Sequence, residues 1–365
     1  MKPIQTALGE FSREKFDALT HVREIALDRL REELKERGYR EVTTSTLVNI
    51  AGSCENPYAS FRLNYYGTPA HLSQSAQIQL ENLVLSLRRG FFTVNNSFRE
   101  ENYDDPEAQG RRLSEFTLVE PERPFEGLSP EQALERIIEE EAEVVKIAAL
   151  RVVEQCSPDL KVLGGDVDYL RKALSARFDR ITYDETVRLL KREGVLNEKG
   201  KEYAFGDDLG VRAERKILEM FGNMPTFVTH YPASIKFFNM KRTADGEHVY
   251  SVDLLTPRLG ETVGGAVREE NGEVIKQQLR ESRIVDFLKD QARERAAQSH
   301  QDPELAAQSV DPVIHFPDYF SMLGQTEPIL RGGYGIGFER FVGFLLQSND
   351  ILDTVAHRTL RPSTG

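Results

Sequence analysis

The hydrophobic positions near the start of the chain recur at the spacing of an α-helix. Between residues 14 and 38, Leu19, Val22 and Leu30 fall on one helical face, and Gly38 ends the pattern. The run therefore predicts an amphipathic helix that packs against a core through this face. The same spacing predicts further helices over residues 75–90 and 129–158 and after the glycine-rich stretch GGYGIG.

Short apolar or alternating runs predict strands between these helices. The polar loop ENYDDPEAQG separates GFFTVNNSF from RLSEFTLVEP, so we expect a long antiparallel hairpin over residues 91–121. Because such strands occur in series with helices grouped between them, the pattern indicates an α+β fold rather than alternating βαβ units. Further strands are expected at YREVTTSTLV, FDRITY, PTFVTHYP, FFNMKR and VYSVDLL.

The organisation of the chain indicates one large domain. No internal repeat divides the sequence, and 365 residues are enough to bury a single extensive core. We therefore expect one domain over residues 1–365, with three attached regions. These are a polar N-terminal extension (1–20), a helical insertion (125–225) and a polar insertion (286–312), the last a helix followed by a flexible surface segment.

Composition restricts the partners and the location. The formal net charge of −12 argues against a broad electrostatic grip on nucleic acid. Cys54 and Cys156 are too few for a thiolate metal cluster and fit a reducing compartment. The N-terminus has no apolar core of a secretion signal, and no run of about 18 apolar residues exists. We expect a cytoplasmic protein that does not contact membranes.

The first candidate site lies in FREENYDDPEAQGRRLSEF, where Arg99, Arg111 and Arg112 occur among six acids. A guanidinium is a planar fork that binds phosphate bidentately and keeps its charge at physiological pH. At a strand end, Arg99 could stabilise the charge on a phosphoryl group under attack. Phe116 on the returning strand could stack on a purine. A surface Arg–Glu pair and a core phenylalanine would give the same pattern.

Two later stretches add further candidates. In GGYGIGFER, four glycines permit close backbone approach to a ligand, and Arg340 falls in the first turn of the following helix. In DLLTPRLGETVGGAVREE, Asp253 and Glu261 are suited to Mg²⁺, which proteins hold with one or two carboxylates plus substrate phosphates. Arg268 could pair with a substrate carboxylate. A turn-forming glycine cluster and solvated acids are the alternatives.

Together, FREE…RRLSEF and GYGIGFER resemble motifs 2 and 3 of the class II aminoacyl-tRNA synthetases. The stretches GTPAHLSQSAQIQLE, LSEFTLVEPE and VDLLTPRLGETVGGAVREE resemble the aspartate/asparagine branch, and within it the asparaginyl enzymes. The resemblance runs in family order from about residue 20 to 362. It implies an antiparallel sheet flanked by helices, ATP and Mg²⁺ as cofactors, and a homodimer. The N-terminal OB-fold of this branch has no counterpart before residue 20.

The resemblance also assigns roles to single residues. As catalytic residues, Arg99 would hold the α-phosphate of ATP and Arg340 the γ-phosphate. Glu101 would receive the adenine amino group, and Phe116 would stack under the ring. The remaining nucleotide contacts would be Arg111, Arg112, Gly335 and Gly337.

For the other ligands, Asp253 and Glu261 resemble the magnesium carboxylates. Arg268 resembles the arginine that reads the end of the amino-acid side chain. The other amino-acid contacts would be Glu55, Gln77 and Lys236. Two departures stand out: Ser45 replaces the usual proline of motif 1, which builds the dimer interface, and Arg331 stands where histidine is common.

Two functions fit this reading. In the first, ATP converts an aspartate-like acid to an acyl-adenylate, and ammonia or a small amine attacks it without tRNA, as in the archaeal asparagine synthetases of this branch. In the second, the chain is an asparaginyl- or aspartyl-type aminoacyl-tRNA ligase without the anticodon-binding domain. The missing OB-fold and the acidic charge favour the first function and disfavour tRNA as a partner. A non-catalytic paralogue is the third alternative, against which the intact site residues argue.

Overall fold

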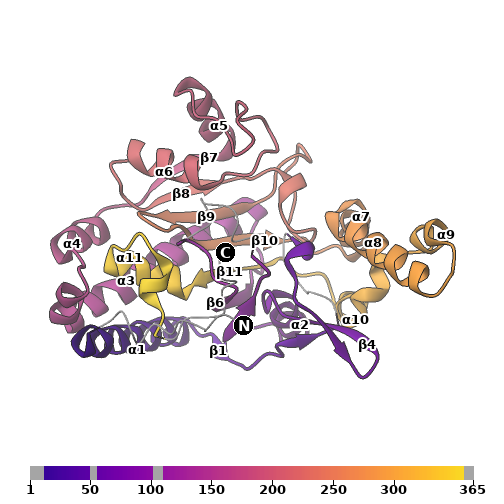
Figure 1. The fold of residues 1–365 in the computed structure, drawn as a ribbon, viewed down its shortest axis with the longest axis horizontal. Coiled ribbons are helices and arrows are strands. Elements are labelled where there is room, and N and C mark those ends of the chain that lie inside the picture. The colour runs from indigo at the N-terminus through magenta and orange to yellow at the C-terminus, as the bar shows by residue number, and fades with distance from the viewer. Residues whose placement is uncertain (1–11, 50–55, 102–109, 357–365) are drawn as a thin grey trace.

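The computed structural model describes residues 12–49, 56–101 and 110–356, which are built around one large sheet (Figure 1). This sheet has eight strands in the order β1-β5-β6-β11-β10-β9-β8-β7. The outer pairs β1–β5 and β7–β8 are parallel, and all pairs between them are antiparallel. The strands are β1 (Arg40–Glu41), β5 (Phe91–Phe98), β6 (Glu115–Pro124), β7 (Asp179–Thr182), β8 (Thr226–Thr229), β9 (Ser251–Thr256), β10 (Gly260–Arg268) and β11 (Arg331–Gly337).

Helices surround this sheet, which confirms the α+β class with a mainly antiparallel sheet flanked by helices. They are α1 (Arg13–Glu36), α2 (Gln77–Leu87), α3 (Pro130–Val162), α4 (Val167–Ser175), α5 (Tyr183–Arg192), α6 (Val211–Met220), α7 (Gly272–Glu281), α8 (Arg283–Gln298), α9 (Pro303–Gln308), α10 (Pro317–Gln325) and α11 (Phe338–Leu346). A small sheet of β2 (Leu47–Val48), β4 (Thr68–Leu72) and β3 (Arg62–Tyr65) lies beside α2. Within the described residues, no helix is long and apolar enough to cross a bilayer.

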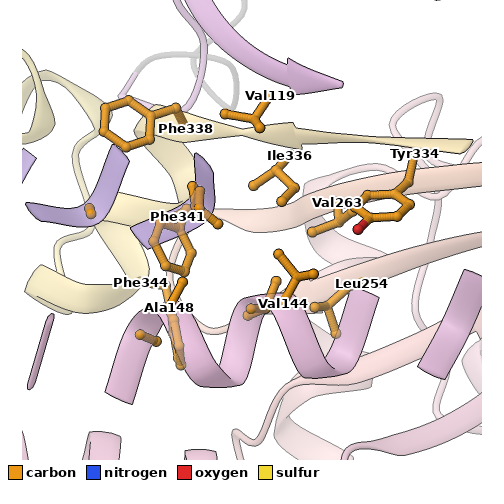
Figure 2. Close-up of a cluster of buried hydrophobic side chains, with 14 of the residues drawn as sticks. Val119, Val144, Ala148, Leu254, Val263, Tyr334, Ile336, Phe338, Phe341 and Phe344 are labelled. Carbon is orange, nitrogen blue, oxygen red and sulfur yellow. The ribbon is translucent and has the colours of Figure 1, made fainter. Parts of the chain in front are cut away.

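The main core fills the space between the sheet and helices α3 and α11 (Figure 2). Val119, Ile336, Val263 and Leu254 are register neighbours on β6, β11, β10 and β9, and all four are fully buried. Because side chains alternate along a strand, this row commits one face of four adjacent strands to the core. The opposite face of the same strands is left for the functional site.

Most predicted elements are confirmed, and the exceptions are informative. The helix expected over residues 14–38 is α1, and the expected hairpin is β5–β6, with Phe91 paired to Glu122 and Phe98 to Glu115. The single strand expected at YREVTTSTLV is wrong, because its two ends join different sheets as β1 and β2.

Two other segments also differ from the expectation. FFNMKR is not a strand but a loop that makes two isolated bridges, Met240 to Arg268 and Arg242 to Val249. Apolar side chains in this loop pack into a second core cluster, which accounts for their strand-like pattern. The segment 286–312 is largely helical, since it contains most of α8 and all of α9, whose start Asp302 caps with its side chain.

One carboxylate is buried between α3 and the sheet. Glu141 is fully buried, and neither side-chain oxygen has a hydrogen-bond partner in the described part of the chain. It lies against Gly265 of β10, where a Cβ atom would collide with Oε1 of Glu141. Burial raises the pKa of Glu141 well above its usual value, and the charges of Asp253 and Glu140 raise it further. Glu141 is therefore a protonated acid that packs against the α3 face of the sheet.

Replacing Glu141 by glutamine is expected to stabilise the fold at about pH 8 but not at about pH 4.3, the usual pKa of a glutamate. The folded protein holds this proton over a range in which the unfolded chain releases it, so stability falls as pH rises above the unfolded value. Each unit of pKa difference corresponds to about 1.4 kcal/mol. Urea unfolding at both pH values should show a gain of at least that size only at the higher one. Glu139→Gln, on the exposed side of α3, is the control; an equal gain at both pH values would contradict the assignment.

Candidate functional site

A cleft opens on the face of the large sheet opposite α3. Two neighbouring glycines of β10 show what lies on the two faces of the sheet. A side chain at Gly264 would meet the carboxylates of Asp253 and Glu261, whereas one at Gly265 would meet Glu141 of α3. Gly264 is also the register partner of Gly335 on β11, so glycine forms the floor of the cleft across two strands. A ligand can therefore approach the backbone closely at this point.

The cleft collects almost all the residues that the sequence assigned to a site. It is lined by the expected nucleotide contacts Arg99, Glu101, Arg111, Arg112, Phe116, Gly335, Gly337 and Arg340. It is also lined by the expected metal and amino-acid contacts Gln77, Lys236, Asp253, Glu261 and Arg268. Glu55 lies outside the described residues. Side chains from helix α2, the β5–β6 hairpin, strands β9 to β11 and helix α11 thus share one cavity.

Three guanidinium groups converge at one end of this cleft. Arg340 lies in the first turn of α11 and donates from Nη1 to the backbone oxygen of Glu261. Burial lowers the pKa of Arg340, and the charges of Arg111 and Arg99 lower it further, against the carboxylates of Glu261 and Glu214. Like charges held so close together favour a polyanionic ligand. This arrangement suits a triphosphate.

Arg111 is fixed by a buried ion pair with Glu214 of α6. Its Nη2 donates to Glu214 Oε2 and, at 2.7 Å, to the backbone oxygen of Leu259. Its Nε and Nη1 are buried without a hydrogen-bond partner in the described chain. The other oxygen of Glu214 accepts from the backbone N–H of Glu261 at 3.2 Å. Glu214 therefore connects the arginine cluster to the strand that carries the candidate metal ligand.

The hairpin forms the end of the cleft where the sequence predicts the adenine contacts. The backbone N–H of Arg99 donates to the oxygen of Ser114 at 2.9 Å, which fixes Arg99 where the strands separate. Its guanidinium carbon lies 5.3 Å from the centre of the Phe116 ring, a cation–π contact. Glu101 forms an ion pair with Arg112 at 3.2 Å. The ring and the acid are thus held beside the arginine cluster.

The residues expected to bind Mg²⁺ fit an oxygen-ligated cation. Oδ1 of Asp253 and Oε1 of Glu261 lie 3.2 and 3.0 Å from the position of a Cβ on Gly264, so both carboxylates point to the same spot above β10. Mg²⁺ takes such carboxylates together with phosphate oxygens. The Nζ of Lys236 lies 2.9 Å from Oδ2 of Asp253, so Lys236 shares this carboxylate.

The cleft also contains a buried acid, at the end where amino-acid contacts are expected, that the sequence reading did not single out. Glu120 faces the cleft from β6 and accepts from the hydroxyl of Ser75 and, at 2.9 Å, from the backbone N–H of Ala76. Burial raises the pKa of Glu120, against these hydrogen bonds. A carboxylate in this position can accept hydrogen bonds from an ammonium group.

Arg268 lines the cleft, but its positive charge is paired with a buried carboxylate. Its Nε and Nη2 donate to the two oxygens of Glu122 at 3.1 and 3.2 Å, and both side chains are buried. Burial raises the pKa of Glu122 to about 7, against the charge of Arg268. The expectation that Arg268 meets a substrate group stays a prediction, and any such group would meet a donor beside an acceptor.

Residues 4–360 match the family described as tRNA synthetases class II (D, K and N). The chain belongs to this family. The match confirms the resemblance seen in the sequence and identifies the protein as a ligase of the class II synthetase type, which uses ATP. The cleft with its arginine cluster is thus the candidate site of a class II synthetase.

Individual relatives narrow the comparison. The asparaginyl-tRNA synthetase of Pyrococcus horikoshii, solved with asparaginyl-adenylate, has a TM-score of 0.75 and 28% identity, over 95% of this chain and 70% of that one. An asparagine–tRNA ligase of Clostridium botulinum is 28% identical over 93% of this chain and 70% of its own length. That of Saccharomyces cerevisiae, a cytoplasmic enzyme, is 31% identical over 92% of this chain and 53% of its own length. This synthetase chain thus spans about half to 70% of these relatives.

The sequence reading missed the acids of this synthetase cleft rather than its arginines. Glu120 and Glu122 alternate with Val119 along β6, so a period of two could have placed both on the face away from the core. Glu81 follows Gln77 by one helical turn in α2 and is fully buried. Glu214 lies on the buried face of α6, between Ala213 and Ile217. Acidic residues within otherwise apolar faces were the sequence signal that could have revealed these residues.

Proposed function

We propose that this chain activates asparagine with ATP and transfers the asparaginyl group to the acceptor end of a tRNA. The observation that carries the proposal is the convergence of Arg99, Arg111 and Arg340 with Asp253 and Glu261 in one cleft. The relatives named above, including one whose structure holds asparaginyl-adenylate, support the asparaginyl choice.

In the first step, a carboxylate oxygen of the amino acid attacks the α-phosphorus of ATP. The bond from this phosphorus to the bridging oxygen of the β-phosphate breaks, and pyrophosphate leaves with the electron pair. Arg99 would stabilise the charge at the α-phosphate, while Arg340 would hold the leaving end of the triphosphate. Mg²⁺ on Asp253 and Glu261 would offset phosphate charge. In the second step, a ribose hydroxyl at the tRNA end attacks the acyl carbon and loses its proton to solvent, and AMP leaves with the electron pair of the broken acyl–oxygen bond.

The tRNA-free amide synthesis that the sequence reading preferred has less support. The relatives named above are tRNA ligases or synthetases, so tRNA becomes the favoured partner rather than the disfavoured one. Adenylate formation is common to both functions. The homodimer, the cytoplasmic location and the single-domain layout with insertions at 125–225 and 286–312 are kept as parts of this proposal.

Amino-acid-dependent exchange of pyrophosphate into ATP tests the first step, with asparagine, aspartate, glutamine and glutamate compared. We expect exchange with asparagine, and at least about tenfold less with the others, a difference of about 1.4 kcal/mol. Adding tRNA or ammonia then tests the second step. Acylated tRNA would support the proposal. Exchange without asparagine dependence would contradict it, and free amide formed from aspartate and ammonia would restore the tRNA-free function.

A further inference from the structure

Four buried charged residues, which we call the charge quartet, lie at the amino-acid end of the cleft: Arg268, Arg331, Glu81 and Glu122. Arg268 and Arg331 are register partners on β10 and β11, so two positive charges stand directly opposite each other in the sheet. Like charges in such a pair repel. Each arginine has a glutamate partner, Glu122 of β6 for Arg268 and Glu81 of α2 for Arg331. With all four ionised, the quartet has no net charge.

Arg331 is completely buried and, like Glu81, does not line the cleft. Its Nε donates to Oε2 of Glu81 at 2.8 Å, and its Nη2 lies 2.7 Å from the same oxygen. Nη2 also donates to the hydroxyl of Tyr319 at 2.7 Å, and Nη1 donates to the backbone oxygen of Glu269 at 3.1 Å. Arg331 can therefore influence the cleft only through its neighbours, chiefly Glu81.

Glu81 is held between the two arginines. Its Oε1 accepts from Gln77 at 2.9 Å and from Asn239 at 2.6 Å, and lies 3.8 Å from Nε of Arg268. Although burial acts in the opposite direction, the charges of Arg331 and Arg268 lower the pKa of Glu81. Glu81 is thus a carboxylate whose charge is compensated mainly by Arg331.

Because Arg331 compensates the charge of Glu81, the Arg268–Glu122 pair is the part of the charge quartet that faces the cleft. This pair presents N–H donors beside carboxylate acceptors. A carboxamide offers an oxygen acceptor and an NH₂ donor, so it can satisfy both members at once. A carboxylate offers acceptors alone and would lie against the like charge of Glu122.

We propose that Arg331 is a positioning residue that tunes substrate selection: by offsetting the charge of Glu81 it sets the net charge of the charge quartet, and this charge sets how strongly the Arg268–Glu122 pair prefers a carboxamide side chain to a carboxylate. The inference rests on the proposed function and deepens it. It also gives a role to the residue that stands where the family commonly has histidine.

Breaking the balance in opposite directions tests this idea. Glu81→Gln leaves a positive excess at the cleft end, whereas Arg331→Met leaves a negative one. The ratio of kcat/KM for asparagine to that for aspartate, measured by pyrophosphate exchange at about pH 8, should fall about tenfold in Glu81→Gln and rise about tenfold in Arg331→Met, mainly through KM. The double variant Glu81→Gln/Arg331→Met is neutral again and should return to within about threefold of the wild-type ratio.

Controls separate selection from folding. Arg180→Met removes a strand arginine paired with Glu135 outside the cleft lining and should leave the ratio unchanged. Arg331→Lys keeps the charge without the planar fork and should keep the ratio close to that of the wild type. A simple loss of structure would shift both single variants in the same direction, and that result would overturn the inference. So would a double variant that does not return to the wild-type ratio.

The wild-type protein distinguishes this inference from the proposed function. If it exchanges pyrophosphate with asparagine while the two single variants keep its ratio, the inference fails and the function stands. If it exchanges with no amino acid, the proposed function fails. Melting-temperature shifts with asparagine and aspartate then compare the same variants without turnover. Opposite changes in the two single variants would still support the inference, and unchanged preferences would overturn it.

Discussion

Replacing Arg340 by alanine is expected to lower amino-acid-dependent pyrophosphate exchange by about 10³-fold, the effect of removing a preorganised cationic group from a phosphoryl-transfer site. Arg340 is held by the backbone oxygen of Glu261 and lies in the field of Arg99 and Arg111. Nothing else in the first turn of α11 can supply a positive charge, because the neighbouring charged residue is Glu339.

The loss should appear in kcat as well as in KM for ATP, because the group acts on the leaving end of the triphosphate. Arg340→Lys should recover part of the rate, since lysine restores the charge but not the fork. Arg188→Ala is the matched control: Arg188 is also a helix arginine that donates to a backbone oxygen, but it does not line the cleft. Arg340→Ala with exchange within about threefold of the wild type would contradict a phosphate role for this residue.

Replacing Gly260 by alanine is expected to cost about 2–4 kcal/mol of stability and to reduce exchange at least about 100-fold. Gly260 begins β10 at φ +78°, in the left-handed region that favours glycine. A Cβ atom there would collide with both Nη2 of Arg111 and Oε2 of Glu214. The substitution therefore separates a buried ion pair in addition to straining the backbone.

Gly246→Ala separates the two causes of this loss. Gly246 has a similar φ of +75°, but a Cβ atom there would meet nothing within 4 Å. It should cost only the backbone strain, about 1 kcal/mol, and leave exchange near the wild-type rate. Urea unfolding and exchange assays on both variants measure the difference. Equal losses in the two proteins would show that the Arg111–Glu214 pair does not matter.

The local pattern of hydrophobic and polar residues was sufficient to predict much of this fold. The spacing of Leu19, Val22 and Leu30 specified α1, because all three lie on the buried face. The hairpin followed from two apolar runs around a polar loop. Pattern failed at FFNMKR, where Phe237 and Phe238 pack into the second core cluster from a loop, so their burial came from tertiary contacts rather than from a strand.

The candidate site was likewise only partly predictable from the sequence. Arginines next to glycine-rich or polar segments could be recognised from the sequence, and they do line one cleft. Their partners could not, because Arg111 meets Glu214 and Arg268 meets Glu122 across separations of 103 and 146 residues. The sequence shows that an acid such as Glu214 lies within an apolar helix face, but it does not show which positive charge that acid meets.

The distances along the chain between these partners also bear on how the protein reaches its native state. Arg331 and Glu81 are 250 residues apart, yet they form one fully buried contact. Helices such as α1 depend on neighbouring residues, whereas closing so long a loop carries an entropy cost that is recovered only when the sheet is assembled. We therefore expect catalytic competence to arise late on the folding pathway, after most of the helical backbone has formed.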